Sequence, residues 1–257
     1  MEEEKNSDNR NVRGLNKTPS LPHSSTPPFP PSNTPTLQHS HTPPLPHVHT
    51  PTLHPSARPA VFLDRDGTLN EMVYDETHGL LDSPHRPDQL RMVEGAGVFV
   101  RALRDLGFFV VVVTNQPGIA KGTLAPGDLD AINERLRREL EEEGTAWDAL
   151  YLCPHHPEYL QGKRSDRPLT CKCRKPKPGM LLQAARDHGL DLSRSWMIGD
   201  GLNDIQAGRA AGCRTILLAK VKIEQIERFS IEQCEPDAIA ATFSEAVRAI
   251  EAAREIA

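Results

Sequence analysis

A short apolar run, Ala60–Leu63, leads directly into the pentapeptide Asp64-Arg65-Asp66-Gly67-Thr68. Such a run, bounded by turn residues, is typical of a buried strand, and the glycine permits a sharp turn after it. The two carboxylates therefore lie at the carboxyl end of the strand, where open parallel sheets bind ligands. An EF-hand loop also begins with acids at its first and third positions, but it needs Gly at the sixth and Glu at the twelfth. This chain has Leu69 and Asp75 there, so a plain acidic turn is the alternative that remains.

Strand and helix patterns alternate after this point. Five short apolar runs predict buried strands: Val61–Leu63, Phe108–Val113, Leu150–Leu152, Trp196–Ile198 and Thr215–Leu218. Five amphipathic stretches predict helices: Gly95–Leu106, Pro126–Glu142, Pro178–His188, Asn203–Ala211 and Phe243–Ile256. Glycines follow four of them, as helix C-caps do: Gly107, Gly144, Gly189 and Gly212. The alternation predicts an α/β fold in which a parallel sheet has helices on both faces.

Composition divides the chain into two parts. Residues 1–58 hold 12 of the 23 prolines and six of the 11 histidines, with few aliphatic side chains. Such a segment buries too little apolar surface to offset its ordering entropy, so we predict a disordered tail. The alternative interpretation of this tail is a metal-binding segment, because histidine-rich tracts are able to bind metal. Residues 59–257 are long enough for one well-buried domain.

Charge and cysteine content narrow the class of protein. The predicted domain carries 25 Lys/Arg and 31 Asp/Glu, a net charge of −6, whereas nucleic-acid binders show basic faces. No apolar stretch approaches 18 residues and no apolar segment follows the N-terminus, so neither a membrane span nor a secretory signal is expected. Five cysteines in that setting indicate metal chemistry in a reducing compartment. We therefore expect a cytoplasmic, monomeric protein with no nucleic-acid or membrane partner.

Polar motifs follow three further strands. The second strand ends in Thr114-Asn115-Gln116, and the fourth ends at Asp200. Asp204 follows one helical turn later, where we expect it in the outer shell of a metal or as a charge at a helix N-terminus. Arg174-Lys175 precedes the helix that begins near Pro178. Taken singly, each motif has a structural alternative. Thr114-Asn115-Gln116 is compatible with a capped turn, Arg174-Lys175 with a solvated basic loop, and Asp200 with a helix N-cap. Their order of acid pair, hydroxyl, cation and acid is what phosphoryl transfer through an aspartyl phosphate requires.

Two long segments, 71–91 and 153–177, interrupt the alternation at the same edge of the predicted sheet, where they are placed to form a lid. The second contains Cys153, His155, Cys171 and Cys173, the Cys₃His set of a structural zinc site. The spacing is tighter than usual, so unrelated surface cysteines are an equal alternative, and His156 competes with His155 as the ligand. Cys213 and Cys234 lack such neighbours and are expected to be buried and inert.

The ordered motifs resemble the haloacid-dehalogenase (HAD) superfamily over residues 59 to about 220. With Cys153-Pro154-His155-His156-Pro157 and Cys171-Lys172-Cys173-Arg174-Lys175-Pro176, the chain looks like the subgroup of heptose-bisphosphate and histidinol-phosphate phosphatases. The resemblance implies a Rossmann-like three-layer fold with a minimal cap and a zinc-bound loop. It also implies Mg²⁺ and Zn²⁺ as cofactors and a role in carbohydrate metabolism.

The resemblance assigns roles to individual residues. Asp64 would be the nucleophile and Asp66 the general acid/base. Thr114 and Lys175 would hold the phosphoryl group, while Arg174 and the amides of Asn115 and Gln116 would bind substrate. The Mg²⁺ ligands would be Asp64, the Asp66 carbonyl and Asp200, and the Zn²⁺ ligands would be Cys153, His155, Cys171 and Cys173.

The activity implied is removal of the 7-phosphate of D-glycero-D-manno-heptose 1,7-bisphosphate through an aspartyl-phosphate intermediate. Three alternatives are kept. One is a histidinol-phosphate phosphatase with the same chemistry, and another is a non-enzymatic, zinc-stabilised binding module. The third, a nucleic-acid 3′-phosphatase, is disfavoured by the acidic domain.

Overall fold

A computed structural model describes residues 57–75, 79–165, 170–218 and 228–255. The predicted tail, residues 1–58, lies outside the described residues apart from Ala57 and Arg58. The fold and the site below therefore belong to the predicted 59–257 domain. No helix among these described residues is long and apolar enough to cross a membrane.

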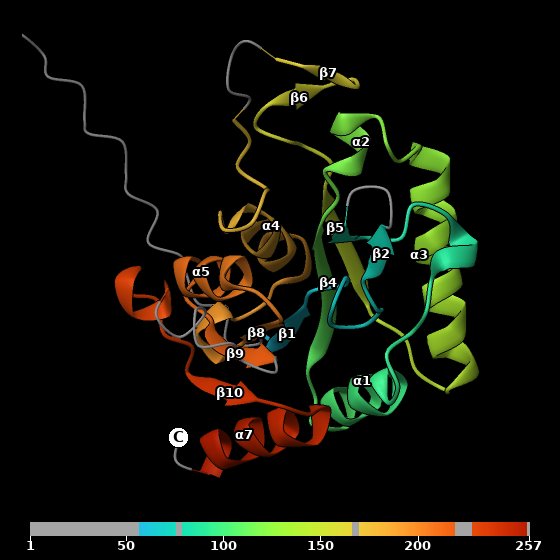
Figure 1. Ribbon diagram of the computed structural model, residues 1–257. Helices are drawn as coiled ribbons and strands as arrows, with labels where there is room; N and C mark the ends of the chain where they lie inside the picture. The colour runs from blue at the N-terminus through green and yellow to red at the C-terminus, as the bar shows by residue number, and fades with distance from the viewer. Residues whose placement is uncertain (1–56, 76–78, 166–169, 219–227, 256–257) are drawn as a thin grey trace, which may run out of the picture. The chain divides into compact units, whose positions relative to one another are not determined.

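A six-stranded parallel sheet forms the centre of the domain, in the order β10-β9-β8-β1-β4-β5 (Figure 1). The strands are β1 (Ala60–Leu63), β4 (Phe109–Asn115), β5 (Ala149–Cys153), β8 (Trp196–Gly199), β9 (Arg214–Leu218) and β10 (Ala238–Ala240). β1 pairs in parallel with β4 on one side and with β8 on the other. The ends of these three central strands consequently meet at one edge, as the sequence predicted.

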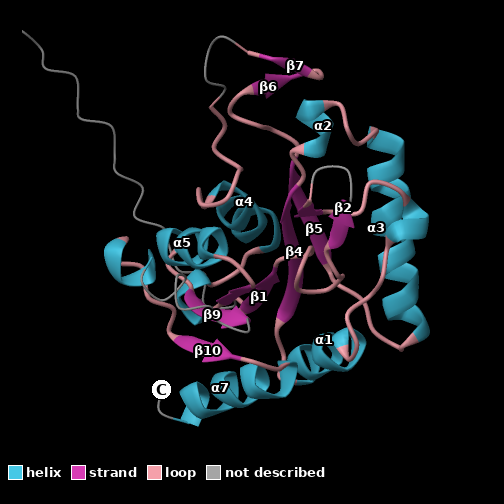
Figure 2. Cartoon of the chain, in the orientation of Figure 1, coloured by secondary structure: helices cyan, strands magenta, loops and turns pink. Residues whose placement is uncertain are grey.

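Helices cover both faces of the sheet. They are α1 (Ala96–Asp105), α3 (Pro126–Glu142), α4 (Gly179–His188), α5 (Leu202–Ala211) and α7 (Phe243–Glu255), with the short α2 (Gly118–Lys121) and 3₁₀ turns at Pro87–Gln89 and Leu192–Arg194. Val61 and Leu63 pack with α1, α3 and α7, whereas Ala60 and Phe62 pack with α4 and α5. Successive side chains of a strand point to opposite faces, so β1 contributes to both cores. The result is the predicted three-layer fold (Figure 2).

The predicted helices and strands are confirmed to within a few residues. The four predicted C-cap glycines all adopt positive φ, as the end of a helix requires. Sequence patterns did not predict β10 or two small antiparallel hairpins, β2 (Val73–Asp75) with β3 (Leu80–Asp82) and β6 (Tyr159–Leu160) with β7 (Lys163–Arg164). Strands of two or three residues are too short to show a period. The hairpins lie within the two long segments, which accords with a minimal cap.

Candidate active site

The site is built where β8, β1 and β4 end side by side. Asp64 follows β1, Thr114 lies near the end of β4, and Asp200 follows β8. Lys175 is contributed by the segment between β5 and α4. Residues up to 136 positions apart in the chain are thereby brought to one edge of the sheet.

Lys175 is the cation at the centre of the site. Its side chain is 2% exposed, and its Nζ lies 2.8 Å from Asp64 Oδ1 and 2.6 Å from Asp204 Oδ1. Nζ also donates to the Val113 carbonyl at 2.8 Å. The buried ammonium thus has three oxygen partners, the number it can donate to. These two carboxylates raise the pKa of Lys175 despite the opposing effect of burial, so the side chain is charged.

Asn115 fixes the backbone of Lys175. Its Nδ2 donates to the Lys175 carbonyl at 3.1 Å, and its Oδ1 accepts from the Lys175 N–H at 3.0 Å. Both ends of the amide are therefore engaged with the backbone. The structure shows the Asn115 side chain positioning the lysine, while its predicted contact with substrate stays a prediction.

Asp66 is held by a dense set of hydrogen bonds. Its carboxylate accepts from Arg65, Asn70 and Gln116, and the shortest of these bonds is 2.6 Å from Gln116 Nε2 to Oδ2. Ser83 Oγ donates to Oδ2 at 3.0 Å, and Thr114 Oγ1 lies 3.4 Å from the same oxygen. Burial raises the pKa of Asp66, but Arg65 and the hydrogen bonds more than offset it, so the net direction is downward.

Three carboxylates converge beside Lys175. Oxygens of Asp64, Asp200 and Asp204 lie within 4.8 Å of one another. Burial and the neighbouring Asp204 raise the pKa of Asp64 to about 8 and that of Asp200 to about 6. One lysine does not balance three acids, and oxygen-rich, negatively charged clusters are what Mg²⁺ binds. The donor set therefore fits a divalent cation.

Gly67 makes room for this cluster. Its φ is +83°, and a Cβ at this position would lie 2.2 Å from Asp200 Oδ2. Only glycine combines that backbone conformation with so close an approach. The Gly of the pentapeptide is thus required both for the turn and for the position of the acid from β8.

The four predicted zinc ligands lie together in the 153–177 segment. Cys153 Sγ is 3.3 Å from Cys173 Sγ and 3.7 Å from Cys171 Sγ. His155 Nδ1 is 3.5 Å from Cys153 Sγ and 3.3 Å from Cys173 Sγ. Tetrahedral zinc with Zn–S bonds of about 2.3 Å separates its sulfurs by about 3.8 Å, so the spacing fits a zinc ion. His156 is not among these ligands, because its Nδ1 accepts the backbone N–H of Glu158.

The cysteine cluster is continuous with the lysine segment. Arg174 Nη1 donates to the His155 carbonyl at 3.3 Å, and Lys177 Nζ donates to the Cys171 carbonyl at 2.6 Å. Gly179, at the start of α4, donates its N–H to the Lys172 carbonyl at 3.1 Å. A metal that fixes the four ligands would therefore also fix Arg174 and Lys175.

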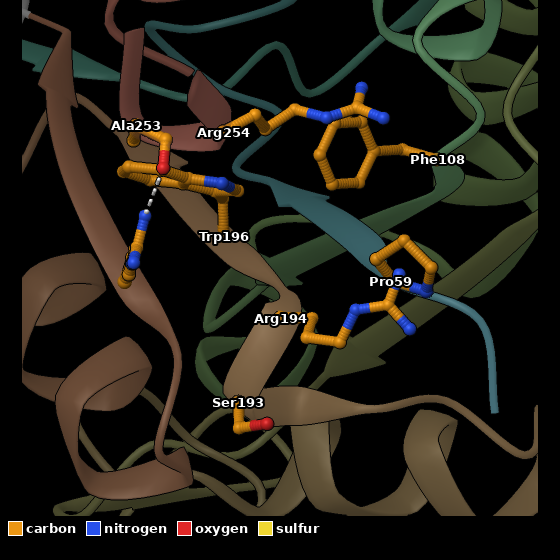
Figure 3. Close-up of a pocket in the computed structure, with 8 residues that line it drawn as sticks. Pro59, Phe108, Ser193, Arg194, Trp196, Ala253 and Arg254 are labelled. Atoms are coloured by element: carbon orange, nitrogen blue, oxygen red, sulfur yellow. Dashed lines mark hydrogen bonds between the residues drawn. The ribbon is translucent and has the colours of Figure 1, made fainter. Parts of the chain in front are cut away.

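Two cavities bear differently on the site. One, of about 530 Å³, adjoins Asp66 through Ser83 and is lined by Val73, Tyr74, Asp82, Ser83, His85, Arg86, Gln89, Thr123 and Asp128. The other, of about 230 Å³, lies among the amino ends of the strands and the end of α7. Figure 3 shows Arg254 there beside Phe108. The Arg254 Cζ lies 5.6 Å from the centre of the Phe108 ring. Among the residues that the structure describes, no carboxylate lines this second cavity, so this lining lacks the groups that the phosphoryl chemistry uses.

The structure brings together the predicted Asp64, Asp66, Thr114, Gln116, Lys175 and Asp200, with Arg174 on the adjoining 153–177 segment. Sequence patterns did not single out the three further polar residues Arg65, Asn70 and Ser83 that hold Asp66, or Asn133, which holds Arg65. A cation between two acids was a signal available for Arg65. Asn133 gave no such signal, because it lies 68 positions away on α3.

Known proteins share this fold and these sequence features. A family model described as HAD-hydrolase-like matches residues 172–246. The chain is 40% identical over 162 residues to a D-glycero-beta-D-manno-heptose-1,7-bisphosphate 7-phosphatase of Yersinia pestis, covering 63% of this chain and 80% of the relative. It is also 40% identical over 162 residues to the Escherichia coli K12 protein of the same name, covering 63% and 79%.

A solved structure agrees with these relatives. The D,D-heptose 1,7-bisphosphate phosphatase of B. bronchiseptica, crystallised with magnesium and phosphate, has a TM-score of 0.59 and 29% identity. The match covers 77% of this chain and 99% of that one. The chain has the fold of the HAD superfamily and is a phosphoric monoester hydrolase. Within that class, the chain belongs to the D-glycero-beta-D-manno-heptose-1,7-bisphosphate 7-phosphatase family.

Proposed function

We propose that this chain hydrolyses the 7-phosphate of D-glycero-D-manno-heptose 1,7-bisphosphate in a Mg²⁺-dependent reaction. The proposal is supported by the relatives and, in the structure, by one observation above all. Asp64 lies at the carboxyl end of β1 with its Oδ1 2.8 Å from a buried lysine ammonium. A carboxylate held in this way beside a cation is arranged to attack a bound phosphoryl group.

The first step forms a covalent intermediate. An Asp64 carboxylate oxygen attacks phosphorus while the bond from phosphorus to the sugar oxygen breaks. Asp66 gives its proton to the departing sugar oxygen. Thr114 and Lys175 hold the phosphoryl oxygens through the hydroxyl and the ammonium. In the second step Asp66 takes a proton from water, whose oxygen attacks phosphorus and releases Asp64.

The donor atoms indicate which residues would hold each metal ion. Asp64, Asp200 and the Asp66 carbonyl would hold Mg²⁺, which when bound neutralises charge on the acids and the phosphoryl oxygens. Asp204 stays paired with Lys175. Zinc would be held by the three thiols and His155 as a structural ion. Such thiolate ligands suit a reducing compartment. We also propose that the protein is cytoplasmic and monomeric.

The 530 Å³ cavity is where we place the leaving sugar, since Ser83 joins it to the general acid. His85 and Arg86 line it together with Asp82 and Asp128. These two carboxylates favour a ligand with an ammonium group. Histidinol phosphate carries one, so it is the second candidate substrate. Arg174 favours the bisphosphate, because a guanidinium binds a second phosphate bidentately and repels an ammonium.

Side-by-side kinetics with Mg²⁺ test the proposal. We expect a higher kcat/KM for the heptose bisphosphate than for histidinol phosphate. Arg174→Ala should lower only the former, by about tenfold, which corresponds to about 1.4 kcal/mol. Arg164→Ala, which removes an exposed arginine paired with Glu158 on the neighbouring hairpin, is the matched control and should change neither. The opposite substrate preference would overturn the assignment and leave the phosphatase chemistry in place.

A further inference from the structure

We propose that Arg65, braced by Asn133, is a positioning residue that orients Asp66 and reserves its Oδ2 as the oxygen that carries the proton. This inference rests on the proposed function, in which Asp66 is the general acid/base. Arg65 hydrogen-bonds the carboxylate of Asp66 and not the carbonyl that would hold Mg²⁺, and Asn133 hydrogen-bonds Arg65. They act on the reaction through Asp66 alone.

Arg65 is the largest fully buried side chain among the described residues, with an exposure of 0%. A guanidinium is always charged and has five N–H donors, so burying it requires fixed partners. Its Nε and Nη2 donate to Asp66 Oδ1 at 3.1 and 2.9 Å, and Nη2 also reaches Oδ2 at 3.1 Å. The carboxylate is thus gripped along one side by a rigid planar fork.

Asn133 holds the other end of that fork. Its Oδ1 accepts from Arg65 Nη1 at 2.7 Å. Asn133 is 7% exposed and lies on α3, whose neighbouring Ile132 and Leu136 are fully buried in the core. Arg65 therefore fixes the orientation of Asp66 against the packed helix α3 and not against a loop. Catalytic groups keep a productive geometry when the residues behind them are fixed in this way.

The two oxygens of Asp66 have different neighbours. Oδ1 accepts from Arg65 Nε and Nη2 and from Asn70 Nδ2, which lies at 3.0 Å. Neither a guanidinium nor an amide nitrogen is able to accept a hydrogen bond. A proton on Oδ1 would point at other hydrogens, so this oxygen is kept as an acceptor.

Among the groups that contact Oδ2, Arg65 Nη2 at 3.1 Å is able only to donate, whereas the other three are able to reverse their role. Ser83 Oγ lies at 3.0 Å and Thr114 Oγ1 at 3.4 Å, and a hydroxyl both donates and accepts. Gln116 donates from Nε2 at 2.6 Å, and rotation of its amide would present an acceptor oxygen. Oδ2 is also the oxygen that Ser83 links to the proposed sugar cavity. When Asp66 is protonated, the proton therefore resides on Oδ2 and passes from there to the departing sugar oxygen.

Leaving-group dependence tests this role, because a leaving group that is already a weak base needs no proton. The wild type and Arg65→Lys are compared on an alkyl phosphate, glycerol phosphate, and on 2,4-dinitrophenyl phosphate. Lysine keeps the charge but has no fork. We expect kcat/KM of Arg65→Lys, which reports the steps up to formation of the phosphoenzyme, to fall on the alkyl ester by about 10- to 100-fold, within the range for loss of acid catalysis. On the aryl ester it should stay within about threefold of wild type.

Asn133→Ala is the second variant, in case Arg65→Lys does not fold, and its loss should be smaller but equally selective. Arg137→Lys on the same helix, an exposed residue paired with Glu141, is the matched control and should affect neither ester. Equal losses on both esters would show a merely structural role and overturn the proposal, as would no loss on either. A wild type inactive on both esters and on the heptose bisphosphate would refute the proposed function itself, and this inference with it.

Discussion

Replacing Lys175 by methionine should destabilise the domain strongly, because it leaves two buried carboxylates without their cation. Methionine has nearly the same length and keeps the packing, so the change removes mainly the charge. Asp64 and Asp204 lie 2.8 and 2.6 Å from Nζ, with exposures of 15% and 3%. At an effective dielectric constant of about 20, each contact has a gross attraction of about 6 kcal/mol, which desolvation largely offsets.

The net effect is estimated from the partners left behind. Removing one member of a buried ion pair costs about 3–5 kcal/mol. In a domain of about 200 residues, each kcal/mol shifts Tm by about 2–4 °C, so we expect Tm to fall by about 6–20 °C in the absence of Mg²⁺. Adding Mg²⁺ should restore part of this loss, because a divalent cation at the same acids replaces the missing charge.

Thermal unfolding at pH 7 measures this directly. Lys177→Met, two residues away at an exposed lysine with a single carbonyl partner, is the matched control and should cost less than about 1 kcal/mol. The double variant Lys175→Met with Asp204→Asn should be more stable than Lys175→Met alone, since it removes one of the unpaired charges. A Lys175→Met protein within about 1 kcal/mol of wild type would refute the electrostatic reasoning.

Three further outcomes are expected. Burial and Asp204 raise the pKa of Asp200 to about 6, so the folded state keeps a proton that the unfolded chain releases near pH 4. The Mg²⁺-free protein should therefore lose stability as pH rises from about 4 to about 6. Asp200→Asn should weaken this pH dependence of stability. Cys171→Ser should lower the zinc content measured by elemental analysis, while Cys213→Ser, a buried thiol outside the cluster, should not; equal content in both would contradict the zinc assignment. Gly67→Ala should weaken Mg²⁺ activation at least tenfold, because its Cβ displaces Asp200; an unchanged Mg²⁺ titration would show that Asp200 is not a ligand.

The sheet was predictable because its central strands are continuous apolar runs. β1 and β4 are buried almost throughout, so hydrophobicity alone marks them. β10 is the exception, since Ala238–Ala240 offers two small side chains and one exposed isoleucine. Its place at the sheet edge is set by pairing with β9 and by α7, which local sequence does not report.

The groups of the site divide in the same way. Asp64 and Thr114 were predictable because polar residues at strand ends have a known location in parallel sheets. The ion pair between Lys175 and Asp204 is a direct contact, where the sequence suggested an outer-shell or helix-terminal charge for Asp204. The anchoring of Arg65 by Asn133 spans 68 positions, and no spacing rule reaches that far.

Trapping the phosphorylated enzyme tests the central claim, that Asp64 is the nucleophile and Asp66 the acid/base. Asp66→Asn with a radiolabelled aryl phosphate, such as 2,4-dinitrophenyl phosphate, separates the two steps. The first step needs no proton with this leaving group, whereas the second still needs a base to activate water. Label should therefore accumulate on the protein after a rapid acid quench, up to one phosphoryl group per chain.

The double variant Asp64→Asn with Asp66→Asn is the control for the site of attachment. The account predicts stable labelling of Asp66→Asn and none of the double variant. Label that persists in the double variant would place the phosphoryl group on another residue. Turnover by Asp66→Asn without any trapped label would mean that water attacks the substrate directly, and either result would contradict the mechanism.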